Sequence, residues 1–185
     1  MTEIRLRPGP YRPDTQLPTL LGKEREPPGD PSQPFAVYEG PHGPMEGYLV
    51  EDRRATVVRG PALAEPVHLA WGLDAGADRD WLRRLMNGIS CRVGSTEVVL
   101  RQRRFGFTRA ARGVQISAGD RAYLARLRRY KTYVVERAGG EELARYPRPG
   151  QEVGWLRDDA DQLEAVLVFL LDASGLRLEP AASLP

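Results

Sequence analysis

A segment near the C-terminus, roughly Asp159 to Ala173, sets the tightest limit on what this chain can fold into. Its large apolar residues recur at the i, i+3, i+4 and i+7 spacing of a helix, and two more make the remaining face apolar too. A helix without a polar side must be covered from most directions. We therefore predict a buried helix that acts as an inner pillar of the core. Its large apolar residues are Leu163, Val166, Leu167, Val168, Phe169, Leu170 and Leu171.

The ends of this helix carry signals of their own. Asp161 and Glu164 suit the positive N-terminal end of a helix, and Gly175 is the expected stop. The run Asp158-Asp159-Ala160-Asp161 allows two interpretations, because carboxylates cap helices and also ligate hard cations. Capping explains the acids without a metal, and the spaced ligands of a calcium loop are absent from the run, so we favour capping.

Upstream, short alternating runs broken by turn residues predict antiparallel strands. Arg121–Arg129 fits either a helix or a strand, and we favour a strand because the next run is a clear one. A short helix is predicted over Asp78–Asn87, with Gly88 as its stop. The predicted strands are 35–39, 46–51, 54–59, 66–73, 89–93, 96–101, 104–108, 113–117, 121–129, 130–136 and 142–146.

The first 34 residues contain eight prolines. Proline lacks an N–H donor and pushes the preceding residue towards extended conformations, so we expect no helix here and no central strand. We predict an extended or disordered arm over residues 1–34, a single β-rich domain with its C-terminal helix over 35–176, and a tail over 177–185. The expected fold class is α+β, predominantly antiparallel β (barrel or sandwich), with a short middle helix and a buried C-terminal helix.

Hairpins followed by one all-apolar terminal helix resemble the tubby C-terminal and LURP-one (phospholipid-scramblase-like) barrels. The hairpin from Tyr133 to Arg145 and the helix from Asp159 to Ala173 carry this resemblance, which covers residues 35–176 in architecture. It implies a β-barrel wrapped around a hydrophobic C-terminal helix. It also implies a role in binding anionic lipid or as a cytosolic β-rich module. The Pro-rich arm and the 78–87 helix depart from the simplest version.

Positive charge is concentrated in the middle of the chain. Residues 79–148 carry seventeen basic and six acidic residues, a net charge of +11, whereas residues 35–78 have a net charge of −4 and residues 149–185 of −5. Such a block is either an anion-binding face or one part of an internally compensated fold. The candidate residues for an anionic partner are Arg101, Arg103, Arg104, Arg126, Arg128, Arg129 and Lys131. Phe105 and Phe107 lie among them, as in surfaces that stack bases above a cationic groove.

Catalytic and metal chemistry receives little support from the residues. Cys91 with His68 as base would be a nucleophile pair, but Cys91 alternates with Ile89 and Val93, which favours a buried, inert thiol. His42 lies in a Gly/Pro loop, where an exposed turn residue is expected, and His68 is expected to face solvent. Two histidines do not complete a usual metal site without carboxylates from elsewhere. We expect no cofactor and no enzyme activity.

The sequence thus favours a non-enzymatic intracellular binding or assembly module that presents an arginine-rich β surface. A protein partner or self-association is expected, with the 1–34 arm as the contact. The alternative partner is an anionic surface or nucleic acid, bound by the basic and aromatic strands of 101–131. The third hypothesis is a cysteine-dependent enzyme. The single cysteine suits a reducing compartment, and no run of about 20 apolar residues is present, so a cytoplasmic location without a transmembrane segment is expected.

Overall fold

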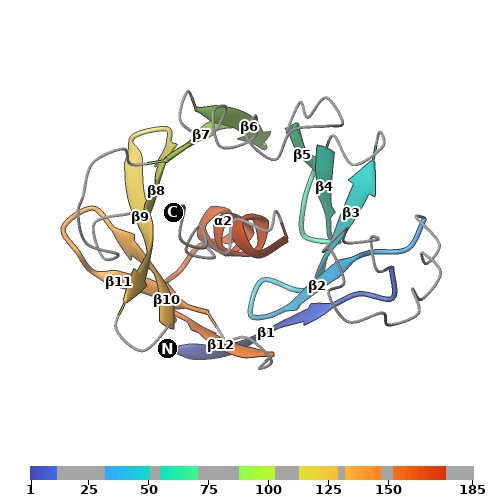
Figure 1. Cartoon of the computed structure of the whole chain (residues 1–185), viewed down its shortest axis with the longest axis horizontal. Coiled ribbons are helices and arrows are strands. Elements are labelled where there is room, and N and C mark those ends of the chain that lie inside the picture. The colour runs from blue at the N-terminus through green and yellow to red at the C-terminus, as the bar shows by residue number, and fades with distance from the viewer. Residues whose placement is uncertain are drawn as a thin grey trace, which may run out of the picture.

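The computed structural model describes residues 1–11, 32–50, 55–70, 88–102, 113–128, 132–146 and 152–173. Within these ranges, twelve strands form one antiparallel sheet that curls into a nearly closed barrel, and a helix lies inside it (Figure 1). The expected β-dominant α+β class is confirmed, in its barrel form. The elements are β1 (Thr2–Pro8), β2 (Ala36–Glu39), β3 (Met45–Val50), β4 (Ala55–Arg59), β5 (Val67–Ala70), β6 (Ile89–Val93), β7 (Thr96–Gln102), β8 (Gly113–Ala118), β9 (Arg121–Arg128), β10 (Thr132–Arg137), β11 (Glu142–Arg145), β12 (Val153–Leu156) and α2 (Gln162–Ala173).

The sheet order is β5-β4-β3-β2-β1-β12-β11-β10-β9-β8-β7-β6. The chain therefore runs as a meander in which β1 pairs with the last strand, β12, and joins its two halves. β5 and β6 lie next to each other at the top of Figure 1, but no backbone hydrogen bond between described residues joins them. Because neighbouring strands alternate in direction, every second connection lies at the same end of the barrel. We call the end at which α2 begins the helix rim.

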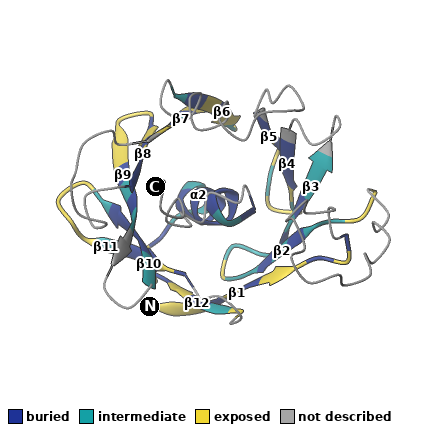
Figure 2. Ribbon diagram, in the orientation of Figure 1, coloured by how far each residue is buried: buried dark blue, intermediate teal, exposed yellow. Residues whose placement is uncertain are grey.

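Helix α2 is covered on all sides by the sheet (Figure 2). Among its residues, Phe169 and Leu170 are fully buried, and the charged residue Glu164 is also buried. The Phe169 ring lies 5.8 Å from the ring of Tyr38 on β2, measured between centroids. The Tyr146 hydroxyl donates a hydrogen bond of 2.6 Å to the carbonyl oxygen of Val168. The prediction of a buried C-terminal helix is confirmed.

The helix begins later than the sequence pattern suggests. Residues 158–161 are not helical, and α2 starts at Gln162. Asp161 is the capping residue: its Oδ1 accepts a 2.9 Å hydrogen bond from the Glu164 backbone N–H, and Glu164 Oε2 accepts one of 3.2 Å from the Asp161 N–H. This reciprocal pair is a capping box, with aspartate in place of serine or threonine. The acids before Asp161 therefore precede the helix.

Ten predicted strands correspond to β2 through β11, and the strand alternative for 121–129 is confirmed. β12 was not predicted, because Val153-Gly154-Trp155-Leu156 is too short to show a clear alternation. The predicted strand 104–108, the helix 78–87, the stop at Gly175 and the tail 177–185 lie outside the described residues. Within the described ranges, no helix has the length and apolar content that crossing a membrane requires.

The expectation of an arm over residues 1–34 is wrong for its first part. Thr2–Pro8 is a central strand, paired with β12 on one side and β2 on the other. Ile4 and Leu6 point into the core, whereas the other residues of the strand are exposed. Prolines occur in this run only at its end, Pro8, so the ladder loses no interior donor. The β-domain therefore begins at residue 2. Residues 12–31, most of the expected arm, lie outside the described residues.

A glycine on β3 lets the helix approach the sheet. A Cβ added at Gly47 would lie 3.3 Å from the Cβ of Ala173 and 3.5 Å from Cζ of Phe169. We expect Gly47→Val to destabilise the fold by about 1–3 kcal/mol, because the γ-methyl groups overpack this contact. Chemical denaturation followed by circular dichroism measures the change. Glu46→Val, on the outward side of the same strand, is the matched control, and an equal effect of both would contradict close packing of α2 on β3.

Candidate functional site

The helix rim holds a pocket of about 380 Å³. The β8–β9 turn, β9, the end of β10 and the segment that leads into α2 form its walls. Its lining is mostly charged, with more acidic than basic side chains. The lining residues are Asp120, Arg121, Ala122, Tyr123, Arg137, Ala138, Asp159, Asp161 and Glu164.

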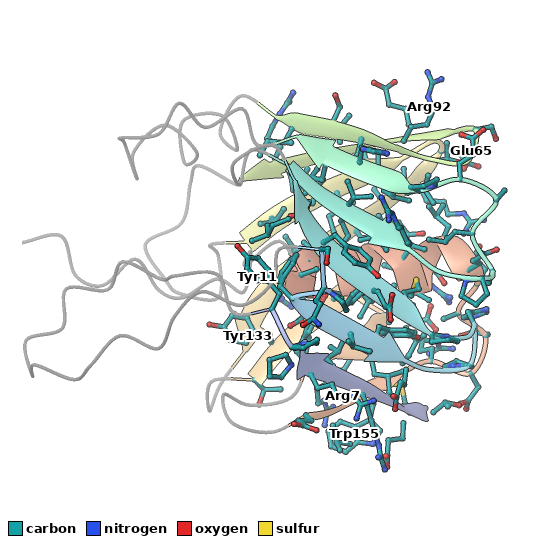
Figure 3. The ribbon with its side chains drawn as sticks, turned by 90° about the vertical axis from the view of Figure 1, so that its right-hand side faces the viewer. Arg7, Tyr11, Glu65, Arg92, Tyr133 and Trp155 are labelled. Carbon is teal, nitrogen blue, oxygen red and sulfur yellow. The ribbon has the colours of Figure 1, made fainter. Side chains whose placement is uncertain are left out.

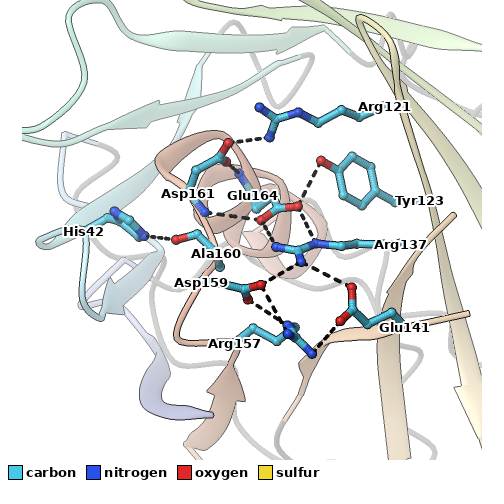
Figure 4. A network of polar contacts seen from close by, with 10 residues as sticks. All are labelled: His42, Arg121, Tyr123, Arg137, Glu141, Arg157, Asp159, Ala160, Asp161 and Glu164. Carbon is cyan, nitrogen blue, oxygen red and sulfur yellow. Dashed lines mark hydrogen bonds and ion pairs between the residues drawn. The ribbon is translucent and has the colours of Figure 1, made fainter. Parts of the chain in front are cut away.

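The central contact of the pocket joins Arg137, at the end of β10, to Glu164, in the first turn of α2 (Figure 4). The guanidinium Nε lies 2.9 Å from Oε1 and Nη2 lies 2.7 Å from Oε2, a bidentate geometry. Only 4% of the Glu164 side chain is exposed. Hydrogen bonding to Glu164 raises the pKa of Arg137 above its ordinary value, more than burial lowers it. Tyr123 also donates to Glu164 Oε1, at 3.2 Å.

A second group of ion pairs lies on the solvent side of Arg137. Asp159 accepts from Arg137 Nη1 at 3.1 Å and from Arg157 Nε at 2.7 Å. Glu141 receives Arg157 Nη1 at 2.8 Å and Arg137 Nη1 at 3.3 Å. The hydrogen bonds from Arg157 and Arg137 hold the pKa of Asp159 well below its usual range. These residues and Glu164 form what we call the Arg137 network.

The remaining acids before the helix have separate partners. Asp158 accepts the Met1 ammonium and the Thr2 hydroxyl, each at 2.6 Å, and these bonds lower its pKa. Burial raises the pKa of Asp161, but hydrogen bonds from Arg121 and the Glu164 backbone outweigh it, so the pKa is lowered. Each acid thus faces its own donors. Capping is confirmed for Asp161, and the described residues contain no group of three or more potential metal-ligating side chains.

Cys91 and His68, the predicted nucleophile and base, point to opposite faces of the sheet. Cys91 points into the core from β6 and is 7% exposed, and burial raises the pKa of its thiol to about 12. His68, on neighbouring β5, is exposed on the outer face. The predicted burial of Cys91 and the solvent-facing His68 are confirmed. His42 is half-buried instead of exposed, since its Nε2 donates to the carbonyl oxygen of Ala160 at 2.7 Å and closes the helix rim.

Two of the predicted anion-binding side chains are described. Arg101 is exposed on β7 and Arg126 is half-buried on β9, with β8 between them. Arg126 Nη2 lies 2.9 Å from Glu136 Oε2, and the Glu136 side chain is 3% exposed, so part of this charge is compensated internally. Arg128 ends β9, but its side chain is not described. Outside the described residues lie Arg103, Arg104, Phe105, Phe107, Arg129 and Lys131.

Sequence reasoning missed Arg137 and Tyr123 as partners of the helix. The Asp161-x-x-Glu164 spacing was a visible capping signal, but nothing in sequence marks a strand arginine twenty-seven positions away as the partner of Glu164. The pocket positions a helix, because its two arginines, Arg121 and Arg137, form ion pairs with most of its carboxylates. This geometry suits anchoring better than proton transfer. Comparison with known proteins found no matching family, no matching curated protein and no matching solved structure.

We expect Arg137→Ala to destabilise the protein by about 3–5 kcal/mol, because it leaves the buried Glu164 carboxylate without its cation. Arg137→Ala/Glu164→Gln should recover part of that loss. Arg5→Ala is the matched control, since the Arg5–Glu3 pair is solvent-exposed and should contribute about 1 kcal/mol or less. Urea denaturation measures all three. Equal losses for Arg137→Ala and Arg5→Ala would show that the Arg137 network does not anchor the helix.

Low pH should lower the stability of the protein through the carboxylates at the helix rim. The pKa values of Asp158, Asp159 and Asp161 are lowered in the folded protein, whereas in the unfolded chain these carboxyls titrate near about 3.9. A lowered folded-state pKa stabilises the fold above the unfolded pKa, and this contribution is lost as the pH falls below it. Denaturation midpoints at pH 6 and pH 3 should therefore differ less in Asp159→Asn than in the unmodified protein. An identical pH dependence would contradict the role of Asp159.

Proposed function

We propose that this protein is a non-enzymatic binding or assembly module that contacts its partner with its outer surface. The observation that supports this is the occupied barrel interior: α2 fills it, with buried side chains on every face. A small barrel filled by side chains leaves its outer faces and rims for recognition. The barrel around a hydrophobic helix also supports the proposed resemblance to the tubby and LURP-one barrels.

The proposed partner is anionic, and the strand order supports one shared basic surface. Arg101 is paired in register with Gln115 of β8, and Arg126 with Gly113 of the same strand, so both arginines flank β8 on the outer face. The chain leaves β7 at Gln102 and β9 at Arg128, both at the end opposite the helix rim. The segments that follow, 103–112 and 129–131, contain four and two basic residues and no acid.

Internal compensation limits how much of this charge is available. Ten arginine side chains are described, and seven of them form ion pairs: Arg5, Arg7, Arg121, Arg126, Arg137, Arg145 and Arg157. Arg59 lies over the ring of Tyr48 at 5.0 Å. Arg92 and Arg101 have no ion-pair partner among the described residues. Arg101 is therefore the described member of the basic surface whose charge is most available to a partner.

The proposal predicts a localised polyanion site. We expect the protein to bind a heparin column at low salt, and Arg101→Glu/Arg103→Glu/Arg104→Glu to elute at clearly lower salt. The matched control is Arg7→Glu/Arg59→Glu/Arg92→Glu, which changes the net charge equally on other strands. At a localised site the affinity depends on contacts between particular basic residues and anionic groups of the ligand. Each anionic group engaged costs roughly one log unit of affinity per log unit of salt.

Equal shifts for the two variants would show that only net charge matters, and absence of retention of the unmodified protein would overturn the anionic partner. An electrophoretic shift with single- or double-stranded nucleic acid at low salt separates the alternatives. Retardation that the first variant abolishes would make nucleic acid the partner. No retardation, with heparin retention intact, would leave another anionic surface as the partner.

A further inference from the structure

Trp155 on β12 is an exposed aromatic residue on the outer face of the barrel. It is 41% exposed, and among the described residues only Met1 is another large hydrophobic side chain that is exposed. Figure 3 shows Trp155 at the outer edge of the barrel. The inward positions beside it on β12, Gly154 and Leu156, are buried. Tryptophan and arginine are the residues most enriched at the energetic centres of protein interfaces.

The strands on either side of Trp155 present opposite charges. In register, Trp155 is paired with Arg145 of β11 on one side and with Glu3 of β1 on the other. Neighbouring strands are about 5 Å apart, so this row runs from cation to indole to anion over about 10 Å. Arg145 and Glu3 are both exposed.

The surroundings of this row are electrically balanced. We call the outward residues Glu3, Arg5, Arg7, Glu39, Arg145 and Trp155 the Trp155 face. Its three arginines pair with Glu3, Glu39 and, for Arg145, with Glu142 at 2.8 Å. With Glu142 counted beside the named residues, three cations and three anions give a net charge of zero. The Arg5–Glu3 and Arg7–Glu39 pairs are open to solvent, so exchanging partners costs little.

We propose that the Trp155 face binds the same face of a second copy of this chain. A twofold axis parallel to β12 through Trp155 would place the two indoles together, Arg145 opposite Glu3 of the second copy, and Glu3 opposite its Arg145. The row is thus complementary to itself, which a twofold interface requires because each contact occurs twice. A neutral face does not attract a polyanion, so this surface is separate from the basic one. The inference rests on the proposed function, since it names a second copy as an assembly partner.

The test exchanges the charges at positions 145 and 3 and measures dimerisation by sedimentation equilibrium. Protein concentrations between about 1 μM and 1 mM cover weak to moderate dimers. We expect the unmodified chain to dimerise. Arg145→Glu alone and Glu3→Arg alone should each weaken dimerisation by roughly tenfold or more, because each places like charges opposite each other. Arg145→Glu/Glu3→Arg should restore it, since the row keeps its complementarity with the signs reversed. Trp155→Ala should weaken it by a similar factor.

Arg92→Glu is the matched control: it reverses an exposed arginine on β6, six strands away from β12 in the sheet, and should leave dimerisation unchanged. Far-ultraviolet circular dichroism and the melting temperature check that each variant folds. A monomeric unmodified chain at all concentrations, or a double variant no stronger than the single ones, would overturn the Trp155 dimer. Either result would leave heparin retention untouched, so failure here is distinguishable from failure of the proposed function.

Discussion

The fold depends on a helix that has no surface suited to water. Val166, Leu167 and Val168 follow one another around α2 and so lie on different sides of it, and all are fully buried. A flat sheet covers one side of a helix, whereas a barrel covers every side, so the apolar helix and the curved twelve-stranded sheet require each other. Gly47 on β3 shows how close the fit is, because even one added methyl group there would press on Ala173. Burial of this helix is a principal source of stability, with each large side chain contributing about 1.5–3 kcal/mol.

A buried apolar helix can slide or rotate unless something fixes it, and the Arg137 network supplies that constraint. Glu164 lies in the first turn of the helix, and its carboxylate accepts hydrogen bonds from β10, from β9 and from the backbone of the capping residue Asp161. A bidentate guanidinium contact is directional, which nonpolar packing is not. His42 adds a contact from the β2–β3 turn to the carbonyl of Ala160. The rim thus sets the depth and rotation of α2, while the interior supplies the free energy.

The sequence revealed what depends on local pattern and missed what depends on distant pairing. Alternation located β2 to β11, and the apolar run located α2, because both signals lie within a few residues. β1 was misjudged because proline count was weighed over the whole of residues 1–34, although Thr2–Arg7 contains no proline and alternates Ile4 and Leu6 with charged residues. Of the candidate site, the sequence showed the Asp161 cap but not Arg137, which reaches Glu164 only once β10 has curled around the helix.

Up-and-down connectivity also explains why charges that occur in blocks along the sequence are separated between the two ends of the barrel. Consecutive turns alternate between the two ends, so the acids before α2, with Asp120 and Glu141, gather at the helix rim. β7 and β9 end at the opposite end, and the stretches of sequence that follow them, 103–112 and 129–131, contain basic residues and no acid. Seven of the ten described arginine side chains nonetheless pair with carboxylates, so the overall charge of a segment is a poor guide to what it offers a partner. Charged groups remain available to a partner where ion pairing is incomplete, as at Arg101. They are also available where the ion pairs are exposed to solvent and can exchange partners, as around Trp155.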